Sequence, residues 1–168
     1  MNKYSINLYT KNSFIKTLVL LNIDEVDRKI LKEYLNDSRL SFREIAKRIN
    51  VAVGTVLSRV KKMEKDGVIQ NYTVLLNYEK LGYHLTAVTE VIVSKGKLIQ
   101  VENEIAKLSS TCAVYDITGG ADALIIGKFR NRKELSLFTK NLLALRHVER
   151  TNTHIVLASI KEDFRMYP

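Results

Sequence analysis

Cysteine and proline are almost absent from this sequence of 168 residues. Cys112 is the only cysteine, so neither an intrachain disulfide nor a cysteine zinc cluster can form, and we expect a reducing, cytoplasmic location. The single proline is the last residue, Pro168, which excludes a proline-rich linker. No apolar run approaches the roughly 20 residues that span a bilayer, so we expect no membrane partner.

Positive charge, in contrast, is in excess. The 27 Lys and Arg residues outnumber the 18 Asp and Glu residues, giving a net charge of +9, which favours a polyanionic partner such as nucleic acid or an acidic membrane surface. The excess is local, because residues 39–65 carry eight basic and two acidic side chains, whereas residues 77–168 carry a net charge of only +3. The sequence therefore predicts the polyanion-binding surface within residues 39–65.

Two helices are predicted before and within this basic segment. Apolar residues at helical spacing indicate a first helix over 24–36, with Asp24 as its N-cap. Ser41 and Glu44 have the spacing of a capping box, so a second helix begins at Phe42 and ends at Asn50, a residue type that tolerates the left-handed conformation.

A third helix is predicted over residues 53–66, with Val56, Val60 and Met63 on its buried side and Gly67 as its left-handed end. Two helices joined by a few residues indicate a helix-turn-helix, although a helical hairpin with a solvated charged face has the same spacing. The basic charge favours contact with double-stranded DNA, with Arg59 suited to a bidentate contact to guanine. The predicted DNA contacts are Arg39, Arg43, Gly54, Thr55, Ser58, Arg59, Lys61 and Lys62.

The remaining sequence alternates between strand and helix patterns. Residues 68–74 suit a wing or linker strand. The order that follows is strand, helix, strand, strand, helix, strand, over residues 85–93, 98–108, 112–118, 123–129, 135–145 and 148–160. This order predicts an α+β protein with a C-terminal ferredoxin-like βαββαβ domain. One sheet face, expected to carry Val91, Val114 and Ile155, is left open for a second copy of the chain.

We expect no catalytic site, metal site or cofactor, because the three histidines are scattered and the sequence has no glycine-rich phosphate loop. The turn formed by Gly119, Gly120, Ala121 and Asp122 could bind a free amino acid, with backbone N–H groups holding its carboxylate and Asp122 its ammonium. Thr151 and Thr153 could add hydroxyl contacts. The alternative is a plain hairpin turn that Asp122 stabilises.

These motifs together resemble the leucine-responsive and asparagine-regulator (Lrp/AsnC) family of transcription regulators. The resemblance covers about residues 21–160. It rests on the stretch from Leu21 to Leu31, on the helix-turn-helix from Arg39 to Arg59, on Gly67 to Tyr72, and on Leu81-Gly82, Thr118 to Asp122 and Thr151 to Thr153.

The resemblance implies an N-terminal winged helix-turn-helix, a hinge strand and a C-terminal ferredoxin-like domain of the RAM type that binds an amino acid effector. It also implies homodimers paired sheet to sheet, which assemble further into tetramers or octamers. We accordingly divide the chain into an N-terminal extension (1–23), a DNA-binding domain with its hinge (24–76) and an effector-binding and oligomerisation domain (77–168). Ala52 departs from the family, since Ser is common there as an N-cap, and Ala121 replaces a frequent aromatic residue.

Two other functions are compatible with parts of this sequence. A related group of haem-pathway decarboxylases shares the two-domain layout, but such an enzyme needs histidines for acid–base chemistry and basic residues around a carboxylate pocket. Here the basic residues gather in the helix-turn-helix instead. An effector-sensing partner that does not bind DNA would not need a complete helix-turn-helix.

Overall fold

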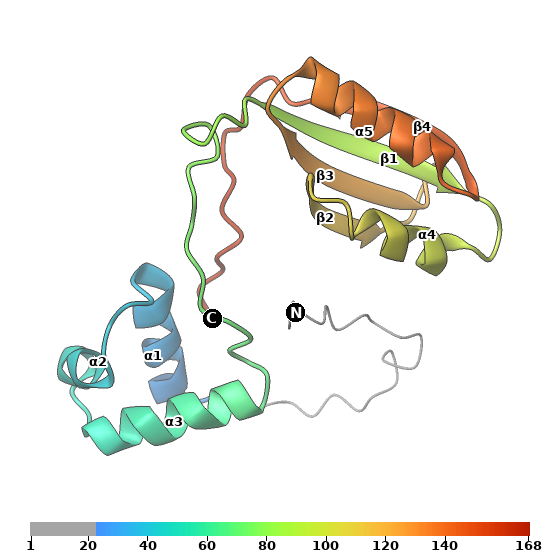
Figure 1. Ribbon diagram of the computed structural model, residues 1–168. Helices are drawn as coiled ribbons and strands as arrows, with labels where there is room; N and C mark the ends of the chain where they lie inside the picture. Colours follow the sequence, from blue (N-terminus) through green and yellow to red (C-terminus); the bar gives the residue numbers. More distant parts are fainter. Residues whose placement is uncertain (1–22) are drawn as a thin grey trace. The chain divides into compact units, whose positions relative to one another are not determined.

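The computed structural model describes residues 23–168, which form two compact units (Figure 1). In the described part of the chain, one unit comprises residues 23–74 together with Phe164–Pro168, and the other comprises Leu75–Asp163. The expected N-terminal extension lies outside the described residues, apart from Ile23. None of the helices in residues 23–168 has the length and apolar character required to cross a membrane.

The first unit contains three helices, α1 (Glu25–Asn36), α2 (Phe42–Ile49) and α3 (Val53–Lys65). Each helix contributes apolar side chains to one shared core, as the helical spacing of those residues predicts. The buried members of that core are Ile30, Ile45, Ala46, Val56, Val60 and Met63. The prediction of three helices, with Val56, Val60 and Met63 on the buried side of the third, is confirmed.

The ends of α2 and α3 are set by their own side chains. Ser41 and Glu44 form the predicted capping box, in which Glu44 N donates to Ser41 Oγ and Ser41 N donates to Glu44 Oε2. Asn50 ends α2 with a φ of 56°. Gly67 has a φ of 73°, and Val68 N donates to the carbonyl of Met63 at 2.8 Å, which is the Schellman arrangement that stops α3.

The strand predicted over residues 68–74 does not form. In this structure the segment after Gly67 is a bend followed by extended chain with no neighbouring strand. Strand N–H and C=O groups need a partner backbone, and residues 23–168 supply none there. The side chains of Val74 and Leu75 are correspondingly 73% and 77% exposed.

The C-terminal residues Phe164–Pro168 belong with the helical unit, although the predicted C-terminal domain extended through residue 168. Arg165 Nη1 donates to the carbonyl of Leu35 at 3.1 Å, and Tyr167 Oη donates to Asn36 Oδ1 at 2.8 Å. The last turn of α1 has no basic residue of its own. Arg165 therefore supplies a cation where the carbonyl groups of α1 lack partners.

The second unit has the predicted βαββαβ order. Its elements are β1 (Leu85–Val93), α4 (Leu98–Ile105), β2 (Thr111–Asp116), β3 (Ala123–Phe129), α5 (Arg132–Ala144) and β4 (Val148–Ile155). The four strands form one antiparallel sheet in the order β2-β3-β1-β4, which confirms the ferredoxin-like fold. β4 ends five residues earlier than expected, at Ile155, where its pairing with β1 stops.

Both α4 and α5 pack on the same face of the sheet. The core between them contains Val91 and Ile125 from the strands, Val101 from α4 and Phe138 from α5. The expectation that Val91, Val114 and Ile155 lie on the open face is therefore wrong. Val91 is fully buried, Val114 packs against this core, and Ile155 pairs with buried Ala87. A one-residue error in the alternation moves every side chain to the opposite face.

Candidate nucleic-acid interface and ligand pocket

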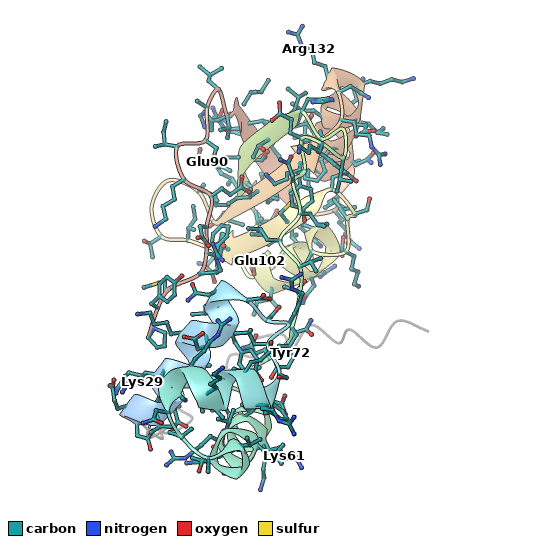
Figure 2. The ribbon with its side chains drawn as sticks, turned by 90° about the vertical axis from the view of Figure 1, so that its left-hand side faces the viewer. Lys29, Lys61, Tyr72, Glu90, Glu102 and Arg132 are labelled. Atoms are coloured by element: carbon teal, nitrogen blue, oxygen red, sulfur yellow. The ribbon has the colours of Figure 1, made fainter. Side chains whose placement is uncertain are left out.

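One face of α3 is exposed along its whole length. Gly54, Ser58, Lys61 and Lys65 lie on it at intervals of four, three and four residues, which places them in one line on a helix. Lys61 extends away from the three-helix core (Figure 2). The exposed face thus combines small side chains near the N-terminus of α3 with lysines in its later turns.

Three other predicted DNA contacts surround this face. Arg43 on α2 and Lys62 on α3 are exposed, and no carboxylate of residues 23–168 lies within ion-pair distance of either. Arg39 is already paired, because its Nε and Nη2 atoms each lie 2.9 Å from an oxygen of Asp37. The same contact lowers the pKa of the Asp37 carboxyl to about 2. Two of the five N–H donors of Arg39 are therefore engaged by a carboxylate of its own chain, and the others remain available for a phosphate.

The N-terminus of α3 is open. Its N-cap, Ala52, makes no side-chain hydrogen bond, as its residue type predicts. A Cβ added to Gly54 would meet no atom within 4 Å, and Gly54 does not have a positive φ. Neither packing nor backbone geometry thus requires glycine at position 54, although glycine costs a helix about 0.5–1 kcal/mol relative to alanine. Thr55 is half-buried, and its carbonyl accepts a hydrogen bond from Ser58 Oγ at 3.0 Å.

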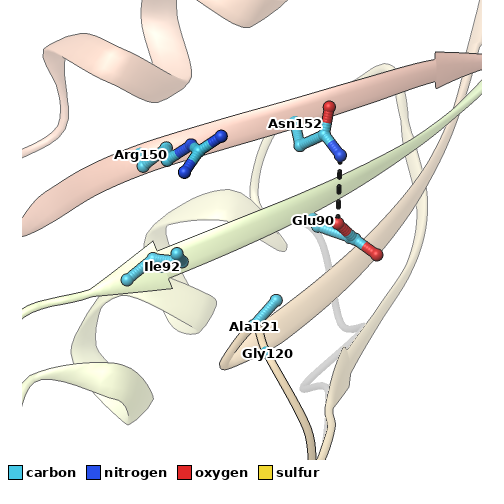
Figure 3. A pocket seen from close by; sticks show the side chains of 6 residues that line it. All are labelled: Glu90, Ile92, Gly120, Ala121, Arg150 and Asn152. Carbon is cyan, nitrogen blue, oxygen red and sulfur yellow. Dashed lines mark hydrogen bonds between the residues drawn. The ribbon is translucent and has the colours of Figure 1, made fainter.

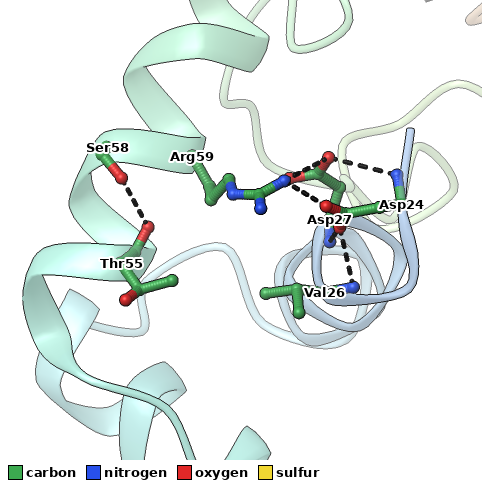
Figure 4. A network of polar contacts seen from close by, with 6 residues as sticks. All are labelled: Asp24, Val26, Asp27, Thr55, Ser58 and Arg59. Atoms are coloured by element: carbon green, nitrogen blue, oxygen red, sulfur yellow. Dashed lines mark hydrogen bonds and ion pairs between the residues drawn. The ribbon is translucent and has the colours of Figure 1, made fainter. Parts of the chain in front are cut away.

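Arg59 is placed differently from the other predicted contacts. Its side chain points to α1, where Nη1 pairs with Asp24 and lies 3.2 Å from Asp27 Oδ2 (Figure 4). The backbone N–H of Asp27 and the Arg59 guanidinium together lower the pKa of the Asp24 carboxyl. This geometry does not support the predicted contact of Arg59 with guanine, because the guanidinium is held by two carboxylates of its own chain.

The second unit has a small pocket of about 160 Å³ between β1, β4 and the glycine turn (Figure 3). It is lined by Glu90, Ile92, Gly120, Ala121, Arg150 and Asn152. Asn152 Nδ2 donates to Glu90 Oε2 at 3.2 Å, which orients that carboxylate. The pocket therefore offers a carboxylate, a guanidinium and the backbone of the glycine turn within one small volume.

Only part of the predicted effector site lines this pocket. Gly120 and Ala121 do, beside Gly119, whose φ of 123° favours glycine. Asp122 instead secures the turn to β1, because its Oδ2 accepts from Val93 N at 2.8 Å and its N–H donates to the carbonyl of Val91. This agrees with the alternative that Asp122 stabilises the turn.

Thr151 and Thr153 lie on the opposite face of β4 from the pocket. Thr153 Oγ1 is 3.1 Å from Oγ1 of Thr89, which is buried under the helices. Strand side chains alternate between faces, so residues 151 and 153 face the helices whereas Arg150 and Asn152 line the pocket. The structure does not bring the two threonines to the turn's pocket.

Four residues that line the pocket are not among those predicted from the sequence: Glu90, Ile92, Arg150 and Asn152. Glu90 pairs with Asn152 and Ile92 pairs with Arg150 across β1 and β4. The available signal was Glu90, the single charged residue within the strand over residues 85–93. The opposite charge in the pocket is Arg150 on β4, and its place beside Glu90 follows only from the register in which β1 and β4 pair. Among residues 23–168, no three His, Cys, Asp or Glu side chains gather as metal ligands.

A helix-turn-helix with an exposed basic helix, followed by a separate α+β domain with a polar pocket, defines a DNA-binding regulator with its own sensory domain. Comparisons with known proteins agree. Residues 23–70 match the family model of winged helix-turn-helix DNA-binding domains, and residues 86–166 match that of the Lrp/AsnC ligand binding domain. The chain belongs to the Lrp/AsnC family of transcription regulators, which are not enzymes.

The match to relatives from Pyrococcus extends over nearly the whole length of those proteins. An HTH-type transcriptional regulator of Pyrococcus furiosus is 51% identical over 148 residues, covering 88% of this chain and 100% of that protein. The HTH-type transcriptional regulator FL11 of Pyrococcus horikoshii is 36% identical over 140 residues, covering 83% of this chain and 93% of that protein.

Solved structures have the same fold. A transcriptional regulator of Neisseria meningitidis, in complex with L-methionine, superposes with a TM-score of 0.79 at 26% identity over 85% of this chain and 95% of that one. AsnC of E. coli superposes with a TM-score of 0.81 at 24% identity over 87% and 99% of the two chains.

Proposed function

We propose that this regulator binds double-stranded DNA by inserting α3 into the major groove. Gly54, Thr55, Ser58 and Lys61 would face the base edges, while Lys62, Arg43 and Arg39 bind phosphates on either side. The exposed stripe of small and basic side chains on α3 supports this assignment. Gly54 is central to it, since a glycine without a packing role permits close approach of backbone to a ligand.

A titration of DNA across salt concentrations tests the α3 surface. We expect Lys61→Gln to weaken binding and to reduce the slope of log K against log salt by about 1 if Lys61 contacts a phosphate. Lys133→Gln, at an exposed position of α5 in the other unit, is the matched control and should change neither the affinity nor the salt slope. Equal effects of the two variants on DNA binding would contradict the assignment of α3 to the interface.

We infer further that the pocket binds a free α-amino acid as the effector. The observation that carries this proposal is that Glu90 of β1 and Arg150 of β4 line the same small pocket as Gly120 and Ala121 of the glycine turn (Figure 3). An amino acid zwitterion presents the complementary charges, with its ammonium toward Glu90 and its carboxylate toward Arg150 and the turn's N–H groups. Ile92 would contact an apolar side chain. The L-methionine complex of the Neisseria relative supports the same ligand class.

Calorimetry with each of the twenty amino acids tests the pocket. Glu90→Gln and Arg150→Gln should each abolish binding or weaken it by at least tenfold, because each leaves one charge of the ligand without a partner. A hydrogen bond to a charged group contributes about 1.5–3 kcal/mol. Glu149→Gln, an exposed change beside Arg150 in the sequence, is the control. Asp122→Ala should weaken binding indirectly by releasing the turn from Val93. Full binding by both pocket variants would place the effector elsewhere.

The protein is further proposed to act as a homodimer that pairs through the open face of the sheet. Val88, Ile92, Leu124 and Ile126 alternate with core residues and lie on that face, which α4 and α5 do not cover. Pairing with a second copy would bury these apolar side chains. Glu90 is on the same face, so effector binding and dimerisation would be linked. Such a dimer would present two α3 helices about 34 Å apart, matching successive major grooves.

Light-scattering mass measurements test the dimer and the linkage. Ile126→Lys should lower the mass from dimer to monomer, whereas Leu137→Lys, on exposed α5, should not affect the dimer. Assembly into tetramers or octamers, which the resemblance implies, would appear as a larger mass that responds to the amino acid. A monomeric wild-type protein would contradict the proposed interface.

We also propose that the protein acts in the cytoplasm, the compartment in which such a regulator would meet both DNA and free amino acids.

A further inference from the structure

Asp24 divides two tasks between its two carboxylate oxygens. Oδ1 caps α1 by accepting from Val26 N at 2.9 Å and from Asp27 N at 3.0 Å, while Oδ2 pairs with Arg59 of α3 (Figure 4). The cap holds the start of α1, and the ion pair joins that start to the middle of α3. A substitution at Asp24 can therefore remove the second contact and keep the first.

Asp27 is a second carboxylate of α1 that lies beside Arg59, in addition to Asp24. This carboxylate is 2% exposed, and its Oδ2 accepts from Asp24 N and lies 3.2 Å from Arg59 Nη1. Its Oδ1 is buried without a hydrogen-bond partner among the described residues. No other cation of residues 23–168 lies within ion-pair distance of Asp27. A buried carboxylate requires such a partner, so the position of Arg59 is strongly determined.

We propose that Arg59 is a positioning residue for DNA recognition, which fixes α3 against the N-terminus of α1 through Asp24 and Asp27 and contacts neither base nor phosphate. Apolar burial is non-directional, whereas a charge-assisted hydrogen bond fixes both a distance and a direction between the groups that it joins. This proposal rests on the proposed α3 surface, because the quantity that it affects is the fit of that surface to the groove.

Electrostatics and positioning predict opposite effects of neutralising Asp24. Removing a negative charge near a DNA-binding surface strengthens DNA binding if only the net charge matters. Losing the partner of Arg59 weakens specific binding if the orientation of α3 matters. Asp24→Asn separates the two, because asparagine caps a helix as well as aspartate does but presents an N–H₂ group where Oδ2 faced Arg59.

The first experiment compares Asp24→Asn with Glu25→Gln. Glu25 is the neighbouring exposed acid, which pairs only loosely with Lys29 at 3.8 Å. The probes are the duplex that the wild-type protein selects from a randomised pool and a scrambled duplex of equal length. We expect Asp24→Asn to weaken binding of the selected duplex about fivefold or more, with little change for the scrambled one. Glu25→Gln should bind both at least as well as wild type. Selected-duplex binding by Asp24→Asn as tight as by Glu25→Gln would overturn the proposal.

A double-mutant cycle with Arg59→Gln then separates positioning from direct contact. If Arg59 acts through Asp24, the double variant should lose little more affinity than either single variant, and the salt slope should stay that of wild type. If Arg59 contacted DNA, its loss would add to that of Asp24→Asn and would reduce the salt slope by about 1. Far-UV circular dichroism confirms that each variant is folded at the temperature of the titration. Should Arg59→Gln fail to fold because Asp27 is buried, Arg59→Lys replaces it in the cycle. Because lysine keeps the charge, the cycle is then read from the additivity of the affinity losses and not from the salt slope.

Failure of this proposal is distinguishable from failure of the α3 surface. Lys61→Gln tests the surface itself and does not involve Asp24 or Arg59. If Lys61→Gln weakens DNA binding and Asp24→Asn does not, the surface stands and the positioning role falls. If neither changes binding, the proposed surface is wrong.

Discussion

The helical unit joins its elements through charged contacts at helix ends, whereas the α+β unit depends on a larger apolar core. Among residues 23–168, six apolar residues are buried in the first core and eleven in the second. In the helical unit, hydrogen bonds and arginine partners lower the pKa of Asp24, Asp37 and Glu44. In the α+β unit, burial raises the pKa of Glu102, and the charge of Asp116 adds to that effect. The small DNA-binding unit thus adds charged contacts between its helices to a small core, while the sensory unit holds its helices on the sheet by apolar packing.

The largest expected effect comes from breaking the apolar core of the α+β unit. Phe129 is fully buried at the end of β3, and its ring lies 5.0 Å from that of Phe138. Phe129→Ala should cost about 3–5 kcal/mol of unfolding free energy, because it leaves a cavity between the sheet and α5. Domain-resolved hydrogen exchange should show lost protection in β1 and β3 with α1 to α3 unchanged. Equal loss of protection in both units would show that they unfold as one.

A change at Gly54 should separate stability from DNA binding in the helical unit. Gly54→Ala should raise the free energy of unfolding by about 0.5–1 kcal/mol, because alanine is the better helix former and its Cβ meets no atom. The same methyl group should weaken DNA binding if the groove approaches this turn. Thermal unfolding and DNA titration of one preparation measure both. A more stable variant with unchanged affinity would remove Gly54 from the interface.

Removing the C-terminal segment should destabilise only the helical unit. A chain ending at Asp163 loses the contacts of Arg165 with Leu35 and of Tyr167 with Asn36. We expect a loss of about 1 kcal/mol, the size of a cation and a hydrogen bond at a helix C-terminus. Hydrogen exchange of the last turn of α1 is the direct readout. Leu157→Ser, at a residue 97% exposed in the other unit, is the control for a change in the same part of the chain. Unchanged exchange in α1 would show that the segment does not dock.

Acidification should affect the two units with opposite signs. The folded-state pKa values of Asp24, Asp37 and Glu44 are lowered, so their contribution is present above the ordinary values near 4 and is lost as the pH falls toward the folded values, about 2 for Asp37. The folded pKa of Glu102 is raised, so the α+β unit gains stability as the pH falls toward 4.5. These effects are small because the three acids of the helical unit are accessible to water. NMR peak intensities between pH 6 and pH 3 measure each unit, and loss of the α+β unit first would contradict this order.

The sequence was sufficient where local chemistry decides the structure. Ser41 with Glu44, Asn50 and Gly67 fixed the ends of α2 and α3 because each acts on backbone within a few residues. It was insufficient where distant segments meet. The partners of Arg59 lie 32 and 35 residues away, and the pocket depends on the pairing of Glu90 with Asn152, so neither follows from local spacing. The strand predicted over 68–74 failed for the same reason, because a strand needs a partner and no other segment of residues 23–168 pairs with this one.

The division of tasks between the two units is tested most directly by measuring DNA affinity with and without the amino acid that calorimetry identifies. The account predicts that Glu90→Gln binds DNA as wild type does when no amino acid is present and does not respond when the amino acid is added. It also predicts that Lys61→Gln binds DNA less tightly and keeps the wild-type response. A Glu90→Gln protein that still responds fully, or a Lys61→Gln protein that loses the response, would contradict the assignment of sensing and DNA binding to separate units.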